Sequence, residues 1–151
     1  MSEAKPSEAV VRAWTRLVRA QHLVLSAIEA DLKGAGLPPL EWYDVLLELS
    51  RGEPRGLRPS VLEGRLLLAQ YNLSRLLERI AKAGYVERRP TPEDGRGHYV
   101  ALTEKGHTVM QRMWPVYRAA IARHVGDKLS EAEANQVASL LGKLLPPRPE
   151  R

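Results

Sequence analysis

The side chains best suited to chemistry in this sequence are arginines and amides, and they are concentrated in its middle. Residues 51–106 carry 11 basic and 7 acidic side chains, whereas residues 1–50 carry 5 and 7. The whole 151-residue chain has a formal charge of +5. A basic segment of this kind indicates a polyanionic partner, most simply nucleic acid. Charge alone fits a weakly positive surface equally well, so a motif has to decide.

Several classes of chemistry are absent from the sequence. Without cysteine there is no disulfide, thiol nucleophile or Cys-ligated zinc. No phosphate-binding, nucleophile-elbow or dinucleotide motif occurs. No pair of histidines has metal-ligand spacing; the four are His22, His98, His107 and His124. Glu41, Asp44 and Glu48 share one face of an expected helix, which we interpret as a solvated face rather than paired catalytic carboxylates. We therefore expect no enzyme, no cofactor and no metal site.

The N-terminal residues lack the apolar run of a signal peptide, and no stretch has the length of a membrane span. We expect a cytoplasmic protein with no membrane partner. Apolar spacing predicts helices at about 7–33, 40–50, 60–67, 70–83, 103–124 and 131–145. Ser130 and Glu133 predict a capping box at the start of the last helix. Two strand-like runs, 85–89 and 98–102, flank a turn-forming segment at 90–97. A helix-turn-helix followed by a β-hairpin is a winged helix, in which the second helix enters a major groove of DNA.

The hairpin region carries the most specific motifs. Asp94-Gly95-Arg96 lies at its expected tip, and Leu102-Thr103-Glu104-Lys105-Gly106 follows its second strand. With these motifs the chain resembles the MarR family of transcription regulators. The resemblance implies a mainly α (α+β) fold. It also implies that residues 1–151 form one MarR-type domain. It places a winged helix at about 40–102 and dimerisation helices at about 7–33 and 103–145. The turn before the recognition helix departs from the family, which leaves the start of that helix open by a residue or two.

The resemblance also implies which residues bind DNA. Amides and guanidinium groups read adenine and guanine edges, and arginines also bind phosphate. The expected DNA-binding residues are Gln70, Tyr71, Asn72, Ser74, Arg75, Arg79, Arg88, Arg89 and Arg96. Asp94 is expected to hold a wing arginine in register rather than to touch DNA. For Tyr71 and Ser74 ordinary surface filling is the alternative, and for Arg88 and Arg89 it is a solvated charge run.

Proteins of the MarR type bind small aromatic or anionic effectors between their dimerisation helices and the winged helix. Four residues could line such a cleft here: His22, Trp42, Tyr43 and Tyr117. The plainer interpretation, which we favour on the frequency of such residues in cores, is that they are core residues with satisfied polar groups.

The sequence therefore predicts a homodimeric regulator that binds double-stranded DNA at a pseudo-palindromic operator. We expect a repressor of adjacent genes that a small-molecule effector releases. Two alternatives stay open at this point. One is a winged helix that serves as a protein-interaction module without a specific DNA site, and the other is an enzyme with an unrecognised site.

Overall fold

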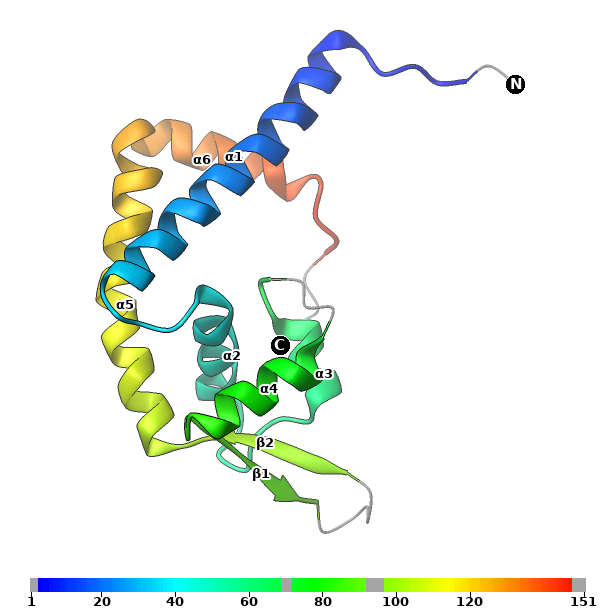
Figure 1. Cartoon of the computed structure of the whole chain (residues 1–151). Coiled ribbons are helices and arrows are strands. Elements are labelled where there is room, and N and C mark those ends of the chain that lie inside the picture. Colours follow the sequence, from blue (N-terminus) through cyan, green and yellow to red (C-terminus); the bar gives the residue numbers. More distant parts are fainter. Residues whose placement is uncertain (1–2, 69–71, 92–96, 148–151) are drawn as a thin grey trace. The chain divides into compact units, whose positions relative to one another are not determined.

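The computed structural model describes residues 3–68, 72–91 and 97–147 of the chain (Figure 1). Its elements follow in the order α1 (Glu8–Gly34), α2 (Leu40–Arg51), α3 (Pro59–Arg65), α4 (Leu73–Lys82), β1 (Val86–Pro90), β2 (His98–Leu102), α5 (Glu104–His124), the 3-10 turn η1 (Gly126–Lys128) and α6 (Glu131–Gly142). The predicted winged helix, mainly helical with one small hairpin, is confirmed. The chain divides into two compact units, residues 29–117 and residues 1–28 with 118–151. That residues 1–151 form one domain stays a prediction.

The unit of residues 29–117 has a core to which every one of its elements contributes. On α4, Leu76, Leu77 and Ile80 recur at the helical period and are almost completely buried. Facing positions on the other elements complete the core: Leu32, Leu40, Val45, Leu46, Leu49, Leu57, Leu62, Val86, Val100, Val109 and Met113. Because α4 buries one face so fully, its opposite face is fixed toward solvent.

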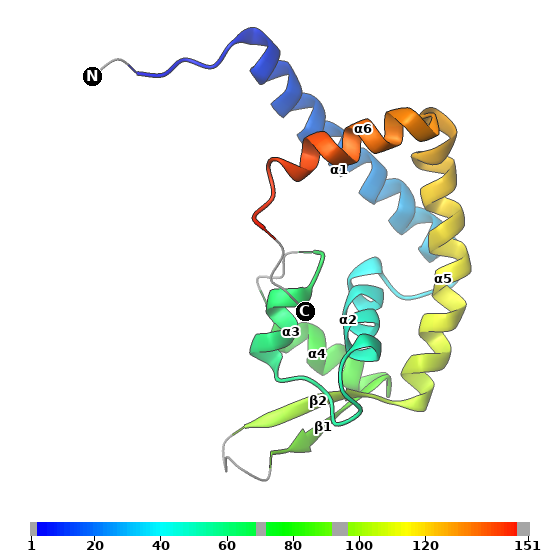
Figure 2. The ribbon, with the colours of Figure 1, turned by 180° about the vertical axis from the view of Figure 1, so that it is seen from behind.

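The hairpin pairs β1 with β2 in antiparallel register, from Val86 opposite Leu102 to Pro90 opposite His98. A third short segment joins it, because Leu57 and Val100 exchange two backbone hydrogen bonds of 2.9 Å. Gly56 precedes this contact with φ +103°, and a Cβ there would overlap with the Val100 carbonyl. The loop between α2 and α3 is therefore anchored on the sheet (Figure 2).

The Leu-Thr-x-x-Gly motif joins β2 to α5. The Thr103 hydroxyl donates to the Gly84 carbonyl at 2.6 Å and accepts the Gly106 N–H at 3.0 Å, so it caps α5 and ties it to the end of α4. The Thr103 N–H also reaches the Tyr85 carbonyl at 3.1 Å. Any Cβ at Gly106 would overlap with that same Tyr85 carbonyl. The motif is thus a packing joint between the wing and a long helix.

The unit of residues 1–28 and 118–151 holds most of α1, the end of α5, and α6. The predicted capping box is confirmed, since Ser130 and Glu133 bond each other's backbone N–H at 3.1 and 3.0 Å. These hydrogen bonds lower the pKa of Glu133. Helix α6 ends at Gly142, so Leu144 and Leu145 lie beyond it rather than inside as predicted. In the part of the chain that the structure describes, no helix is long and apolar enough to cross a membrane.

Candidate nucleic-acid interface

The solvent-facing side of α4 carries three of the predicted DNA-binding residues. Ser74, Arg75 and Arg79 are exposed there, whereas Leu76, Leu77 and Ile80 of the same helix are buried. Arg75 and Arg79 are four residues apart, so they occupy neighbouring turns of one face. The helix begins at Leu73, three residues later than its predicted start near residue 70. Gln70 and Tyr71, which were expected in its first turn, lie outside the described residues.

Asn72 is the N-cap of α4. Its Oδ1 accepts the backbone N–H of Arg75 at 3.3 Å. The sequence suggested a base-reading amide, and the structure adds a second role, because the same side chain starts the helix. Asn72 is exposed, and its NH₂ group has two donors that this cap does not use.

Asp44 is the residue that sequence reasoning missed. Its carboxylate accepts the N–H of Leu67 at 3.0 Å and of Leu68 at 2.8 Å, in the turn between α3 and α4. Residues Asp44 and Glu48 are only 6% and 7% exposed, so the predicted solvated face on α2 is wrong. Burial raises the pKa of Asp44, and the two backbone hydrogen bonds oppose this rise. The buried carboxylate therefore fastens the helix-turn-helix turn to α2. The helical period gave no signal of this role, because Asp44 shares its face of α2 with Glu41 and Glu48.

The two wing arginines of β1 differ in their surroundings. Arg89 donates to the Glu87 carboxylate at 2.6 and 2.9 Å and to the Pro54 carbonyl at 3.1 Å. Arg88 is exposed, and alternation along a strand places it on the opposite face of the hairpin. Arg89 is therefore held against the α2–α3 loop, whereas Arg88 is presented to solvent.

Thr91 and Gly97 close the base of the wing. The Thr91 hydroxyl and N–H both donate to the Gly97 carbonyl, at 3.1 and 3.3 Å. The side chain of Thr91 is buried, which fixes both ends of the tip segment. Asp94 and Arg96, the predicted residues of that tip, lie outside the described residues.

The predicted effector residues do not form one group. Tyr43 of α2 and Tyr117 of α5 lie edge to face with ring centroids 5.2 Å apart, and Trp114, which the prediction omitted, stands 6.3 and 5.8 Å from them. Trp42 instead packs on Tyr85, with centroids 6.0 Å apart. His22 is exposed and belongs to the other unit.

Two members of the aromatic group of Tyr43, Trp114 and Tyr117 carry titratable phenols, namely Tyr43 and Tyr117. Burial raises the pKa of both tyrosines, and the neighbouring Asp44 raises that of Tyr117 further. Both phenols are therefore neutral donors at physiological pH. Among the described residues no cluster of three or more potential metal ligands occurs.

Comparison with known proteins places this geometry in a family. Residues 35–97 match the model of the MarR family. The uncharacterised HTH-type transcriptional regulator YkoM of Bacillus subtilis is 32% identical over 113 residues, which cover 75% of this chain and 71% of YkoM. The transcriptional repressor MprA of Escherichia coli is 30% identical over 103 residues, which cover 68% of this chain and 58% of MprA.

Among solved structures, the fold is similar to that of Sco3205, a MarR family transcriptional regulator from Streptomyces coelicolor in complex with DNA. The TM-score is 0.84 at 24% identity, and the match covers 95% of this chain and 91% of Sco3205. The exposed helix α4, the hairpin beside it and the Thr103–Gly106 joint thus occur within a fold shared over nearly the full chain. The chain belongs to the MarR family of transcriptional regulators.

Proposed function

We propose that this regulator binds double-stranded DNA with the exposed face of α4. The observation that carries the proposal is that Ser74, Arg75 and Arg79 lie on the solvent side of a helix whose other side is fully buried. A rigid helix of this kind fits a major groove, where guanidinium groups reach guanine or phosphate. The DNA-bound state of Sco3205, which has the same fold, supports it. Gln70, Tyr71 and the amide of Asn72 would add contacts at the start of the helix.

The hairpin is the second part of the proposed interface. Arg88 is exposed and would bind phosphate, while Arg96 at the tip would enter the minor groove, where the negative potential is strongest over A·T-rich sequence. Asp94 would hold that tip in register. Arg89 already bonds Glu87 and Pro54, so we assign it chiefly to wing stability, with phosphate binding secondary.

We further propose a homodimer. Among the described residues of the unit formed by residues 1–28 and 118–151, many large apolar side chains are exposed, and α6 has no buried residue. Exposed apolar side chains there are Val10, Val11, Trp14, Val18, Leu23, Ile121, Val137, Leu140, Leu141, Leu144 and Leu145. So much exposed apolar surface is typical of a protein interface. A twofold dimer would present two α4 helices about 34 Å apart to a pseudo-palindromic operator.

Whether the protein represses or activates transcription is proposed by analogy with MprA. MprA is named a transcriptional repressor, and we propose the same role here, on genes adjacent to its own. A small aromatic or anionic effector that binds one dimer arrangement better than another would release DNA. Tyr43 and Tyr117, with Trp114, are the better-supported part of such a site because they form one aromatic group. Trp42 packs on Tyr85 instead, and His22 of the other unit is kept only as a proposed additional residue of the site.

A binding titration tests the DNA proposal. The duplexes are the promoter region adjacent to the gene and a scrambled duplex of equal length, and the variants are Arg75→Ala, Arg96→Ala and Arg112→Ala. Arg112 is an exposed arginine of α5 and serves as the charge-matched control. We expect Arg75→Ala and Arg96→Ala each to weaken specific binding by about 1–3 kcal/mol, and Arg112→Ala to leave it near wild type. Equal affinity of the wild type for both duplexes would instead favour a protein-interaction module.

A further inference from the structure

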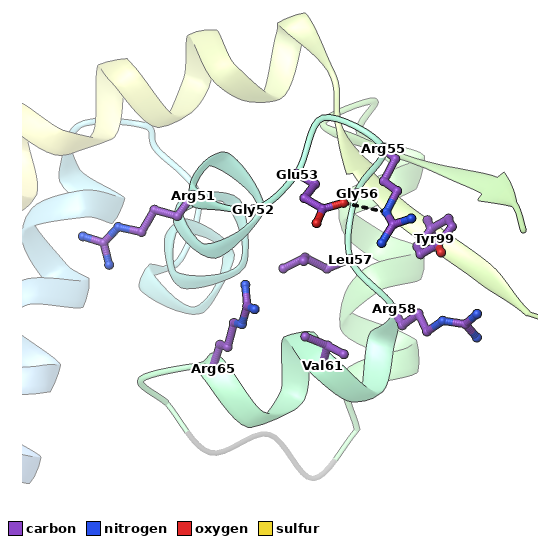
Figure 3. Close-up of a pocket in the computed structure, with 10 residues that line it drawn as sticks. All are labelled: Arg51, Gly52, Glu53, Arg55, Gly56, Leu57, Arg58, Val61, Arg65 and Tyr99. Carbon is purple, nitrogen blue, oxygen red and sulfur yellow. Dashed lines mark ion pairs between the residues drawn. The ribbon is translucent and has the colours of Figure 1, made fainter. Parts of the chain in front are cut away.

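The ring of Tyr99 on β2 lies against two arginines of the α2–α3 loop (Figure 3). The guanidinium carbons of Arg55 and Arg58 lie 5.1 and 5.5 Å from the ring centroid, within the range of cation–π contacts. We call these three side chains the wing clamp. We propose that Tyr99 is a positioning residue for DNA binding, because the wing clamp fixes the direction in which the wing leaves the rest of the winged helix. This role of Tyr99 rests on the proposed function of the wing.

The wing clamp acts on the hairpin just beyond its backbone contact with the loop. Among the described residues, the α2–α3 loop pairs with β2 through the backbone at Leu57 and Val100 alone. Tyr99 is the next residue toward the tip, and from there the described sheet consists only of β1 and β2. A two-stranded ribbon is marginally stable and strongly twisted, so its direction depends on the side chains that attach it. Tyr99 supplies such an attachment at the first position beyond the bridge.

Arg89 gives the loop a second attachment on the same face of the hairpin. Arg89 lies directly opposite Tyr99 in the register, and directly opposed residues of an antiparallel pair share a face. Arg89 donates to the Pro54 carbonyl at 3.1 Å. The loop therefore holds both strands from one face, β1 through Arg89 and β2 through Tyr99.

Each arginine of the wing clamp has a second neighbour besides the ring. Arg55 is paired with Glu53 at 2.7 Å, and Figure 3 shows this ion pair near Tyr99. Arg58 lies beside the base of the tip, because a Cβ added to Gly97 would lie 3.2 Å from the Arg58 Nη1 and 3.0 Å from the Thr91 hydroxyl. Arg58 thus connects the Tyr99 ring with the contact between Thr91 and Gly97 that closes the wing.

The direction of the wing matters because its proposed target is narrow. The minor groove of B-DNA is only about 6 Å wide. Arg96, which is proposed to enter it, belongs to the segment between Thr91 and Gly97. A wing with a fixed direction loses little conformational freedom on binding, whereas a wing that swings loses more. Tyr99 would therefore raise DNA affinity through Arg96, without touching DNA itself.

The test compares Tyr99→Leu, which removes the ring, with Tyr99→Phe, which keeps it, each with and without Arg96→Ala. Affinity is measured by titration against duplexes of the promoter region adjacent to the gene, made with A·T-rich or G·C-rich flanks. We expect Tyr99→Leu to weaken binding to the A·T-rich duplex about tenfold, as Arg96→Ala does, and Tyr99→Phe to bind like the wild type. In the Arg96→Ala background, Tyr99→Leu should cause no further loss, because both changes remove the same contact.

Two results of this titration would overturn the proposal. An additive loss in the double variant would mean that Tyr99 acts on DNA by another route than the wing. Equal losses in Tyr99→Phe and Tyr99→Leu would mean that the ring is not what matters. If Tyr99→Leu does not fold, Arg55→Gln replaces it, since Arg55 is exposed and its loss leaves the ring in place. Its loss of affinity should likewise disappear in the Arg96→Ala background, whereas a phosphate contact of Arg55 would give an additive loss.

A second measurement needs no DNA. Amide hydrogen exchange of the free protein, followed by NMR, reports on the Thr91 N–H, which donates to the Gly97 carbonyl at 3.3 Å. Exchange at Thr91 should be several-fold faster in Tyr99→Leu than in Tyr99→Phe, while exchange within α4 stays the same in both. Wild-type exchange and wild-type affinity in Tyr99→Leu would overturn the wing clamp and leave the DNA proposal standing. Equal affinity of the wild type for the promoter and scrambled duplexes would refute the DNA function, and faster exchange at Thr91 would then still show that Tyr99 holds the wing.

Discussion

Asp44 is the residue through which α2 holds the turn between α3 and α4. Its almost fully buried carboxylate accepts hydrogen bonds from the backbone N–H groups of Leu67 and Leu68. A buried carboxylate costs free energy unless its oxygens are bonded, and here both are. Removing it leaves two backbone N–H groups without their partner. The Asp44 side chain of α2 thus holds the turn that leads into α4, the helix proposed to bind DNA.

We predict that Asp44→Ala lowers the free energy of unfolding by about 1–3 kcal/mol, because two backbone donors lose their acceptor. Urea denaturation followed by circular dichroism measures this. Glu63→Gln on exposed α3 removes the same charge without such contacts and should stay within about 0.5 kcal/mol of wild type. Equal stability of the two variants would show that the Asp44 contacts carry no net energy.

The pH dependence of stability follows from the raised pKa of Asp44. A raised carboxyl pKa means that the folded chain binds this proton more tightly than the unfolded chain. The resulting stabilisation is complete below the ordinary pKa of Asp and disappears as pH rises through the raised folded value. The stability of wild type relative to Asp44→Asn should therefore fall with increasing pH in that interval. Denaturation of both proteins at a series of acidic pH values checks the sign, and a rising difference would contradict it.

Asn72 is the N-cap of α4 and is also proposed to read bases, and substitution can separate these two roles. Asn72→Ala removes the cap acceptor and should lower the free energy of unfolding by about 1 kcal/mol, whereas Asn72→Ser keeps an N-cap oxygen and should remain near wild type. Both variants lack the amide, so both should lose discrimination at the same base pairs of each half-site. Unfolding curves and titrations against operator variants provide the two readings. If Asn72→Ser retains full discrimination, Asn72 is only a cap.

At the scale of elements, the wing is joined to the rest of its unit through glycine and threonine rather than through apolar side chains alone. Gly106 allows the first turn of α5 to lie against the Tyr85 carbonyl, and Thr103 bonds across the same joint. The sequence motif could be recognised without this knowledge. Only the structure shows why the motif has a glycine: the backbone at Gly106 lies directly against the Tyr85 carbonyl.

We predict that Gly106→Ala destabilises the protein by about 1–3 kcal/mol or more, because the new Cβ would overlap with backbone that cannot rotate away. The matched control is Gly64→Ala in α3, where no atom lies within 4 Å of the added Cβ. That change should stabilise the helix by about 0.5–1 kcal/mol. Thermal unfolding of both variants measures the contrast. Similar melting temperatures for the two variants would show that the close packing at Gly106 does not contribute to stability.

The sequence predicted the elements of this fold better than it predicted the contacts between them. Periodicity located α2, α4 and the hairpin because each has one apolar side, and Ser130 with Glu133 announced the start of α6. It failed at Asp44, because the helical period cannot distinguish a buried, bonded carboxylate from a solvated one. It also gave no sign that Arg89 donates to the Pro54 carbonyl, 35 residues away. Nothing in the linear pattern showed that Arg55 and Arg58 lie against Tyr99.

For the whole molecule, the exposed apolar side chains of α1 and α6 argue that the described chain is half of an assembly. Trp14 is 64% exposed and Leu140 is 60% exposed, although both lie on helices with regular apolar spacing. Burying an apolar side chain of this size is worth about 1.5–3 kcal/mol. Burial of the exposed apolar side chains of α1 and α6 would therefore strongly favour association of two copies of the chain. The core of residues 29–117 includes Leu32 near the end of α1 but no residue of α6.

We predict that Trp14→Glu and Leu140→Glu each convert a dimer into a monomer, because a carboxylate in an apolar interface is desolvated without a partner. Sedimentation equilibrium at micromolar concentration measures the mass, which should be twice 16.9 kDa for the wild type. Leu67→Glu is the control, since Leu67 is 74% exposed but lies in the unit of the winged helix, and it should leave the dimer intact. The monomeric variants should lose tight binding to a full operator while retaining weak binding to one half-site, as the two α4 helices no longer act together. A wild type that sediments as a monomer and still binds a full operator tightly would refute the dimer.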